Sequence, residues 1–389
     1  MDLKAKVICY LSLVPLERRK AYAVTTVQTA LALRKLGFEL RYFGPFSKSR
    51  TATLWPFDRR KKISNIILSI NLIMFRFTFL AKLSFVLQRK LLQSRLLVEQ
   101  NLSESNLLWT RDLRVAITYA NRGFAVCCEV HAALTHRELV ALEKLSSRNK
   151  LWLFPISISL KDELLSLSNL REVGISLLPM GADKAFFEAP SVSHSYSPHE
   201  HIRIGYIGSY ETVGITAGLE DVISSLFLQN DFQIEFLVVG VGKGGATALN
   251  EHFAKIQSSK KTQNFSMTLL EWVNHDDVLG YIQSCHMVIL PYQENSFNSG
   301  RFPIKAIEYS ASQIPILCSD TVSHRNIFNE NQVYFYNSKD PESLIIAIKS
   351  LLSDPNQRQN CIRNAYALAL NHTYSSRAAK IAHAIELIK

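Results

Sequence analysis

The sequence predicts an α/β protein built from two doubly wound domains, each a parallel sheet covered by helices. Strand-like apolar runs alternate with helix-like segments along most of the chain, which is the pattern of parallel sheets joined by helical crossovers. At 389 residues the chain is long for one domain and sufficient for two, each with its own core. A polar stretch with two prolines at 188–201, EAPSVSHSYSPHEH, is predicted to be the linker.

The first domain is predicted to span residues 1–188. It opens with a strand at 6–13, followed by a helix near 24–36 that Gly37 stops, since glycine commonly follows the last helical residue. Helices are expected between the later strands. The remaining strands of this half are predicted at 39–43, 107–109, 125–130, 151–156 and 175–178.

The second domain is predicted to span residues 200–389, where the same alternation starts again. Helices are expected between its strands, and the last segment, 375–388, is predicted to be an amphipathic helix. The chain shows no internal repeat and no low-complexity tract. The predicted strands of this half are 202–207, 233–239, 267–270, 286–290, 314–318 and 333–336.

Cysteine usage and the N-terminus predict a cytoplasmic protein. The first residues carry Asp2, Lys4 and Lys6 and then a short apolar strand, which is too short and too charged for a signal peptide. The six cysteines show no C-x-x-C pair and no zinc spacing. They are therefore predicted to be reduced core residues, and no metal site is expected.

Charge is distributed unevenly between the two halves. Residues 1–150 contain 26 Lys and Arg against 10 Asp and Glu, whereas the remainder contains 18 against 23. The basic half therefore suits an anionic partner. We find no recognisable nucleic-acid motif and no aromatic-plus-basic stripe, so nucleic acid is not the expected partner.

An apolar segment with basic ends, residues 59–95, interrupts the first domain. Arg76 and Lys82 lie within its apolar run, which argues against a helix that spans a membrane. Two interpretations remain open: helices buried in the domain or at an oligomer surface, or peripheral contact with an anionic membrane. The second would place the protein at the inner face of the cell membrane.

The stretch 285–320, CHMVILPYQENSFNSGRFPIKAIEYSASQIPILCSD, predicts a strand, a polar loop, a short helix and a second strand. The helix would begin at the carboxyl ends of the strands, where open α/β sheets bind ligands, and Pro303 suits its first turn. Lys305 and Glu308 fall on neighbouring positions of that helix. They could hold a phosphate and a sugar hydroxyl, or they could form a surface ion pair.

The segment 303–317, PIKAIEYSASQIPIL, resembles the nucleotide-sugar signature P-x-K-x-x-E-Y-x-A-x-x-x-P of glycosyltransferase family 4, among the glycosyl transferases group 1. Further segments resemble that family in the family's own order. They are CCEVHAA at 127–133, PISISLKDEL at 155–164, LLPMGADKAFF at 177–187, IRIGYIGS at 202–209 and FLVVGVGKG at 236–244.

The resemblance implies the GT-B architecture, in which two Rossmann-like domains face one another across a cleft and the last helix crosses back to the first domain. It implies a retaining enzyme that moves a hexosyl or related glycosyl group from a nucleoside-diphosphate sugar. The acceptor would be a hydroxyl of a glycan or lipid-linked glycan, in the synthesis of a cell-surface polysaccharide or glycolipid. No cofactor and no metal would be required.

The resemblance also assigns site residues. His131 would lie against the donor sugar and diphosphate, and Glu308 would bind the ribose hydroxyls, to which its two acceptor oxygens are suited; these two are the expected catalytic residues. Glu129 is expected to be a structural hydrogen-bond acceptor. The expected donor-binding residues are Gly208, Ser209, Gly240, Arg301, Phe302, Lys305 and Glu308.

The chain departs from the family pattern at three positions. Gly300 stands where the family has the first glutamate of Glu-x7-Glu, and Glu294 is the candidate substitute. Ser209 stands in the place of a diphosphate-binding arginine. The place of the matching lysine also lacks a cation, being Thr216 or Ala217.

Other cations must therefore neutralise the leaving group if the protein is an enzyme. Arg301 and Lys305 are the candidates from the same pocket. Arg18, Arg19 and Lys20 follow the first strand and are predicted to bind acceptor or phosphate, or else to be solvated loop charges.

Three functions remain open at this point. The leading one is a retaining glycosyltransferase. The missing cations would also suit a non-catalytic GT-B subunit that binds a glycan or a partner transferase. The remote alternative is a basic nucleic-acid-binding protein, whose affinity would fall steeply with salt.

Overall fold

The computed structural model describes residues 7–12, 21–43, 107–146, 148–167, 170–194, 196, 201–212, 214–259 and 264–388. The predicted insert at 59–95 and the predicted acceptor-side residues Arg18, Arg19 and Lys20 lie outside these residues. In the part that is described, no helix is both long enough and apolar enough to cross a bilayer.

Contacts divide the chain into two compact units. Unit 1 comprises Met1–Met180 and Tyr374–Lys389, and unit 2 comprises Gly181–Thr373. The division falls earlier than the predicted end of the first domain at 188, because the segment after Met180 pairs within unit 2. The amide of Ala182 donates to the carbonyl of His372 at 3.0 Å, and Ala182 forms an isolated parallel bridge with Thr373.

Unit 1 contains a sheet of six parallel strands in the order β2-β1-β3-β4-β5-β6. The chain moves from β1 to β2 on one side and then to β3 and onward on the other, so the sheet is doubly wound. Its strands are β1 (Val7–Leu11), β2 (Glu39–Phe43), β3 (Leu107–Thr110), β4 (Ala125–Val130), β5 (Leu151–Pro155) and β6 (Gly174–Ile175).

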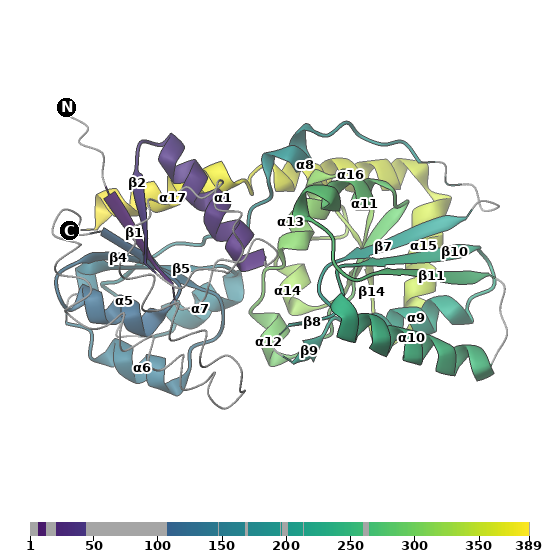
Figure 1. Cartoon of the computed structure of the whole chain (residues 1–389), viewed down its shortest axis with the longest axis horizontal. Helices are drawn as coiled ribbons and strands as arrows, with labels where there is room; N and C mark the ends of the chain where they lie inside the picture. Colours follow the sequence, from purple (N-terminus) through teal and green to yellow (C-terminus); the bar gives the residue numbers. More distant parts are fainter. Residues whose placement is uncertain are drawn as a thin grey trace. The chain divides into compact units, whose positions relative to one another are not determined.

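Helices cover both faces of this sheet. They are α1 (Ala21–Lys35), α5 (Leu113–Ala120), α6 (His136–Glu143), α7 (Ile158–Leu165) and α17 (Tyr374–Leu387), with a short 3-10 helix at Arg148–Lys150. The last helix, α17, lies alongside α1 (Figure 1). Tyr374, Ala378, Ile381 and Ala384 recur at helical spacing on α17 and are buried in the core of that face.

Unit 2 contains a second sheet of six parallel strands, in the order β11-β10-β7-β12-β13-β14. Its strands are β7 (Ile202–Ile207), β10 (Ile234–Val239), β11 (Phe265–Leu270), β12 (Met287–Leu290), β13 (Ile316–Ser319) and β14 (Tyr334–Tyr336). A two-stranded antiparallel hairpin, β8 (Glu211–Thr212) and β9 (Ile215–Thr216), follows β7. The sequence analysis did not predict this hairpin.

The helices of unit 2 also lie on both faces of its sheet, with α9 and α10 on one face and α11, α13 and α16 on the other (Figure 1). The six cysteines of the chain are all buried and none of them forms a disulfide, as predicted. The helices are α8 (Lys184–Glu188), α9 (Leu219–Leu228), α10 (Gly242–Ser259), α11 (Val278–Gln283), α12 (Ser296–Ser299), α13 (Ile304–Ala311), α14 (Val322–Arg325), α15 (Pro341–Ser353) and α16 (Pro355–Ala369), with a 3-10 helix at His275–Asp277.

Candidate active site

The sheet of unit 2 places its ligand-binding edge between β7 and β12. These strands are neighbours, but the chain leaves β7 towards β10 on one side and leaves β12 towards β13 on the other. The loops that follow them therefore diverge, and a doubly wound sheet binds its ligand in the crevice that this divergence opens. The loop after β7 begins at Gly208, and the connection after β12 leads to α13.

Helix α13 begins at this edge without a side-chain cap. Pro303 is its N-cap residue, in extended conformation, and makes no capping hydrogen bond; the sequence analysis had expected it within the first turn. The first helical amides have no partner inside the helix, and no acidic residue lies in the first turn. The helix start therefore favours an anion.

Lys305, in the first turn of α13, reaches across to the end of β7. Its Nζ donates to the hydroxyl of Tyr292 at 2.8 Å and to the hydroxyl of Tyr206 at 3.2 Å. It also lies 4.8 Å from the ring centroid of Tyr206 and 5.4 Å from that of Tyr292. A Cβ atom at Gly208 would stand 1.8 Å from Cε of Lys305, so the lysine occupies the space that only glycine leaves open.

Arg301 also contacts the ring of Tyr292. Its guanidinium carbon is 4.9 Å from the ring centroid of Tyr292 and 5.2 Å from that of Phe297, within the range of cation–π attraction. One guanidinium nitrogen donates to Oδ1 of Asn298 at 3.3 Å. The structure thus brings together the two cations that the sequence analysis proposed.

Lys305 and Arg301 change the pKa of Tyr292. Burial raises the pKa of Tyr292, but Lys305 and Arg301 favour its phenolate more strongly, so the net shift of its pKa is downward. Burial raises the pKa of Tyr206 well above its usual value. Tyr206 is a neutral hydroxyl that donates to the carbonyl of Ser209 at 2.7 Å.

Glu308 is one helical turn further along α13 and is 6% exposed. Burial raises the pKa of its carboxyl group, electrostatic interactions with His275 and Lys305 oppose this increase, and Asp183 adds to it. Among the residues that the structure describes, no donor contacts this carboxylate. A buried acceptor without a donor is unfavourable, and a ligand that donates two hydroxyl hydrogens would satisfy it.

The remaining predicted donor residues lie at the same edge of unit 2. Gly240 follows β10, has φ +89°, and packs against the backbone of Gly208. Ser209 is exposed on the loop after β7. Phe302 stacks on His372, with ring centroids 5.6 Å apart, so its side chain is a packing group and only its backbone can face a ligand.

Glu294, the candidate substitute for the missing first glutamate, has another partner. Its Oε2 accepts from the amide of Val322 at 2.7 Å, at the start of α14. Gly300 is the C-cap residue of α12 and has ordinary right-handed backbone angles. The backbone conformation at this position therefore does not require glycine.

The predicted residues of unit 1 form a separate cluster at the end of β4. Oε2 of Glu129 accepts from Nε2 of His131 at 2.9 Å, from Arg377 at 2.9 Å and from Arg111 at 3.3 Å. Its other oxygen, Oε1, accepts from the indole of Trp109 at 2.9 Å. These donors hold the pKa of Glu129 well below its usual value despite its burial, so it is an ionised structural acceptor.

His131 is a neutral ring at physiological pH. Burial and the nearby Arg111 lower its pKa to about 4. Because the ionised Glu129 can only accept, Nε2 of His131 carries the hydrogen and Nδ1 is left as an acceptor. Its side chain is 27% exposed, so a sugar hydroxyl can reach the ring.

Five residues of these sites were not predicted from the sequence: Tyr206 and Tyr292 in unit 2, and Trp109, Arg111 and Arg377 in unit 1. Each contacts a predicted residue that is distant along the chain, and the pairs have no shared local pattern. For Tyr292 one signal was available, because it lies two residues past the end of β12, at the edge where ligands bind.

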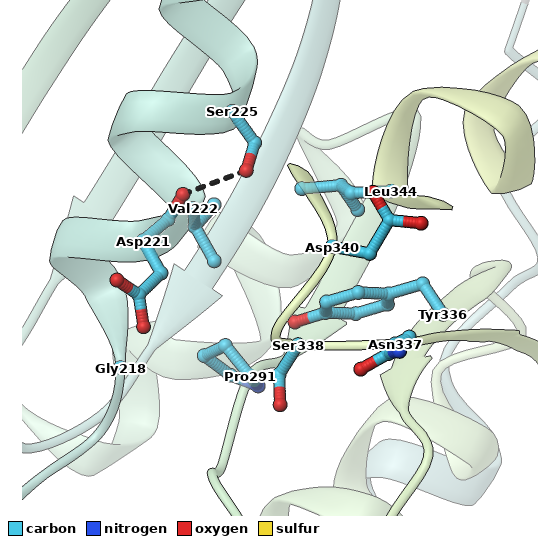
Figure 2. A pocket seen from close by; sticks show the side chains of 10 residues that line it. All are labelled: Gly218, Asp221, Val222, Ser225, Pro291, Tyr336, Asn337, Ser338, Asp340 and Leu344. Carbon is cyan, nitrogen blue, oxygen red and sulfur yellow. Dashed lines mark hydrogen bonds between the residues drawn. The ribbon is translucent and has the colours of Figure 1, made fainter. Parts of the chain in front are cut away.

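A small recess lies beside this edge. It lies between α9 and α15 at the ends of β12 and β14, and Figure 2 shows Tyr336, Pro291 and Asp221 among its walls. Its empty volume is about 250 Å³ even with the open side included, which is below the roughly 300–1,000 Å³ of ligand pockets.

A family model matches much of the second unit. Residues 198–368 match the family model described as Glycosyl transferases group 1. No curated protein sequence matches the chain.

Solved structures match nearly the whole chain at low identity. Sucrose-phosphate synthase from Thermosynechococcus elongatus has a TM-score of 0.65 at 12% identity, covering 97% of this chain and 98% of its own. A lipopolysaccharide outer core galactosyltransferase, WaaB, has 0.63 at 14%, covering 98% and 99%. Anabaena HepE, in complex with UDP and glucose, has 0.63 at 11%, covering 97% and 99%. These likenesses show the GT-B fold, as predicted.

Proposed function

We propose that this glycosyltransferase, whose second unit belongs to the glycosyl transferases group 1, moves a sugar from a nucleoside-diphosphate donor to a hydroxyl of a glycan. The acceptor is a glycan or lipid-linked glycan of a cell-surface polysaccharide or glycolipid. The reaction retains the configuration of the transferred sugar. The more specific assignment to family 4 belongs to the same proposal.

The observation that carries the proposal is the start of α13. An uncapped helix end, a lysine and an arginine are gathered there, and Glu308 follows as a buried carboxylate to which none of the described residues donates. Phosphate oxygens need donors and positive charge, whereas a ribose diol needs acceptors. Lys305 and Glu308 offer a donor and an acceptor within one turn of one helix.

Leaving-group charge is the main chemical demand on this site. As the bond between sugar and diphosphate breaks, negative charge grows on the phosphate oxygen. Lys305, Arg301 and the amides of α13 are already in place to stabilise it. The absent arginine and lysine after β7 are thereby replaced by side chains that come from α13 and from the connection before it.

The sugar side of the reaction uses His131 of unit 1. With its Nε2–H fixed by Glu129, its free Nδ1 accepts from a hydroxyl and orients the sugar or the acceptor. Its low pKa means that it contributes as a neutral acceptor and not as a cation.

Charge neutralisation by side chains makes a metal unnecessary in this proposal. We expect transfer activity to persist after dialysis against EDTA. Complete loss of activity in EDTA, restored by a divalent cation, would contradict this assignment.

Membrane contact through residues 59–95 and a location at the inner face of the cell membrane remain predictions from the sequence. Binding to vesicles with and without anionic lipid measures this contact. A protein that stays in the supernatant with both kinds of vesicle would contradict it.

The test of the proposed function is a thermal-shift screen against UDP, GDP, ADP and their common sugars, since a ligand that binds the folded state stabilises it. The best nucleotide then identifies the donor for transfer assays with glycan acceptors. Product anomers assigned by NMR decide between retention and inversion. No stabilisation by any nucleotide would contradict donor binding.

A further inference from the structure

The side chain of Lys305 has a defined orientation, because two tyrosine hydroxyls accept hydrogen bonds from its ammonium group. The hydroxyl of Tyr292 accepts at 2.8 Å and that of Tyr206 at 3.2 Å. An ammonium group has three hydrogens. Within the described residues no acceptor takes the third, and the lysine side chain lies in the space that the missing Cβ of Gly208 leaves open.

Both tyrosines are themselves fixed. Tyr206 is fully buried and Tyr292 is 4% exposed. The hydroxyl of Tyr206 donates its own hydrogen to the carbonyl of Ser209, so it can only accept from Lys305. The backbone carbonyl of Tyr292 accepts from Ser319 at 2.6 Å, and its ring lies 5.7 Å from that of His324.

Tyr292 serves both cations of the site. Its oxygen accepts from Lys305, while its ring face lies under the guanidinium of Arg301 at 4.9 Å. A long lysine otherwise moves among many rotamers. Two hydroxyls that hold its ammonium group remove this freedom before the ligand arrives.

We propose that Tyr292 and Tyr206 are positioning residues for the transfer reaction: they fix Lys305 so that its remaining N–H points to the leaving diphosphate, and Tyr292 also seats Arg301. This proposal rests on the proposed function of the site. The tyrosine pair thus orients Lys305, one of the two cations that take the place of the arginine and lysine that the loop after β7 lacks.

Tyrosine-to-phenylalanine variants separate positioning from packing, because they remove the hydroxyl and keep the ring. In Tyr292→Phe we expect kcat to fall about 10- to 100-fold, somewhat less than the loss of a direct charge-stabilising donor. KM for the donor should change less than threefold. Tyr206→Phe should show the same pattern more weakly.

Tyr292→Leu should lower kcat further than Tyr292→Phe, because it also removes the ring under Arg301. Tyr336→Phe is the matched control, since Tyr336 is buried and its hydroxyl has no partner among the described residues. It should keep wild-type kcat. Equal loss of kcat in the control and in Tyr292→Phe would overturn the proposal.

A spectroscopic measurement tests the contact without any activity. Ultraviolet difference titration should show one tyrosine that ionises earlier than the others, and Tyr292→Phe should remove that step. Lys305→Met should move the step to higher pH, because the phenolate loses its cation. A titration curve that is unchanged in both variants would overturn the contact.

The two readouts also separate this proposal from the proposed function. If the early tyrosine step is present but no nucleoside diphosphate binds, the proposed function is wrong and the positioning role falls with it, while the Lys305–Tyr292 contact stands. If the donor is turned over at wild-type kcat by Tyr292→Phe and Tyr206→Phe, the proposed function stands and the positioning role is wrong.

Discussion

A guanidinium nitrogen of Arg377 lies 2.9 Å from Oε2 of Glu129, although the two residues are 248 positions apart. Arg377 belongs to the last helix of the chain, and Glu129 lies near the end of β4. Both are buried. Arg377 also donates to the carbonyls of Leu178 and Pro179. This one side chain thus attaches α17 to the edge of unit 1 where His131 lies.

Arg377→Met should destabilise the protein by about 3–5 kcal/mol, because it leaves a buried carboxylate and two carbonyls short of a donor. The double variant Glu129→Gln/Arg377→Met should recover part of this loss, since it removes a buried negative charge that has lost one of its two arginine partners. Urea denaturation of the wild type, both single variants and the double variant measures the coupling. Strictly additive losses would show that the two residues do not interact.

His131→Ala should lower kcat about 100-fold and leave the affinity for nucleotides unchanged, because the histidine belongs to unit 1 whereas the nucleotide residues belong to unit 2. Transfer assays and calorimetric titration with the nucleotide give the two values. His131→Asn keeps a polar group and should retain more activity. A parallel fall in nucleotide affinity would contradict a role on the sugar side.

Gly208→Ala should disable the site through Lys305. The new Cβ would meet Cε of Lys305 at 1.8 Å, so the lysine must leave its tyrosine partners. We expect nucleoside diphosphate affinity to fall at least tenfold. Gly214→Ala is the control: Gly214 also has positive φ but faces open space, so that variant should lose only stability. Equal affinities in the two variants would contradict the account of Lys305.

Acid should destabilise the folded protein between pH 6.5 and about 4. The pKa values of His131 and His324 are both lowered to about 4, so in this window the unfolded chain binds more protons and stability falls as pH falls. For His324, which is fully buried, the loss approaches about 3 kcal/mol. His324→Asn should be less stable at pH 7 but show a shallower decline. An unchanged slope would mean that His324 is not buried as a neutral ring.

The sequence predicted the framework well, because sheet strands depend on local pattern. β2, β4 and β7 have the predicted bounds, and the helix before Gly37 ends as expected, with Gly37 at φ +90°. The β8–β9 hairpin was missed because its strands have two residues each, too few for a periodic signal.

The contacts inside the sites depend on pairings that no local pattern contains. Lys305 was predicted as a phosphate ligand, but its tyrosine partners come from β7 and from the end of β12, which become neighbours only through the strand order. Likewise, Glu129 was predicted as a structural acceptor without its main donor, Arg377. Packing across the sheet determines the partners of both Lys305 and Glu129.

Calorimetric titration with UDP, GDP and ADP tests the central claim most directly, namely that the start of α13 binds a nucleoside diphosphate. The wild type should bind at least one of the three, Lys305→Met should bind it at least tenfold more weakly, and Glu308→Gln should also bind more weakly. Glu308→Gln should unfold at an equal or higher temperature, because a buried carboxylate without a donor opposes folding. No binding by the wild type, or equal affinity in all three proteins, would contradict the account.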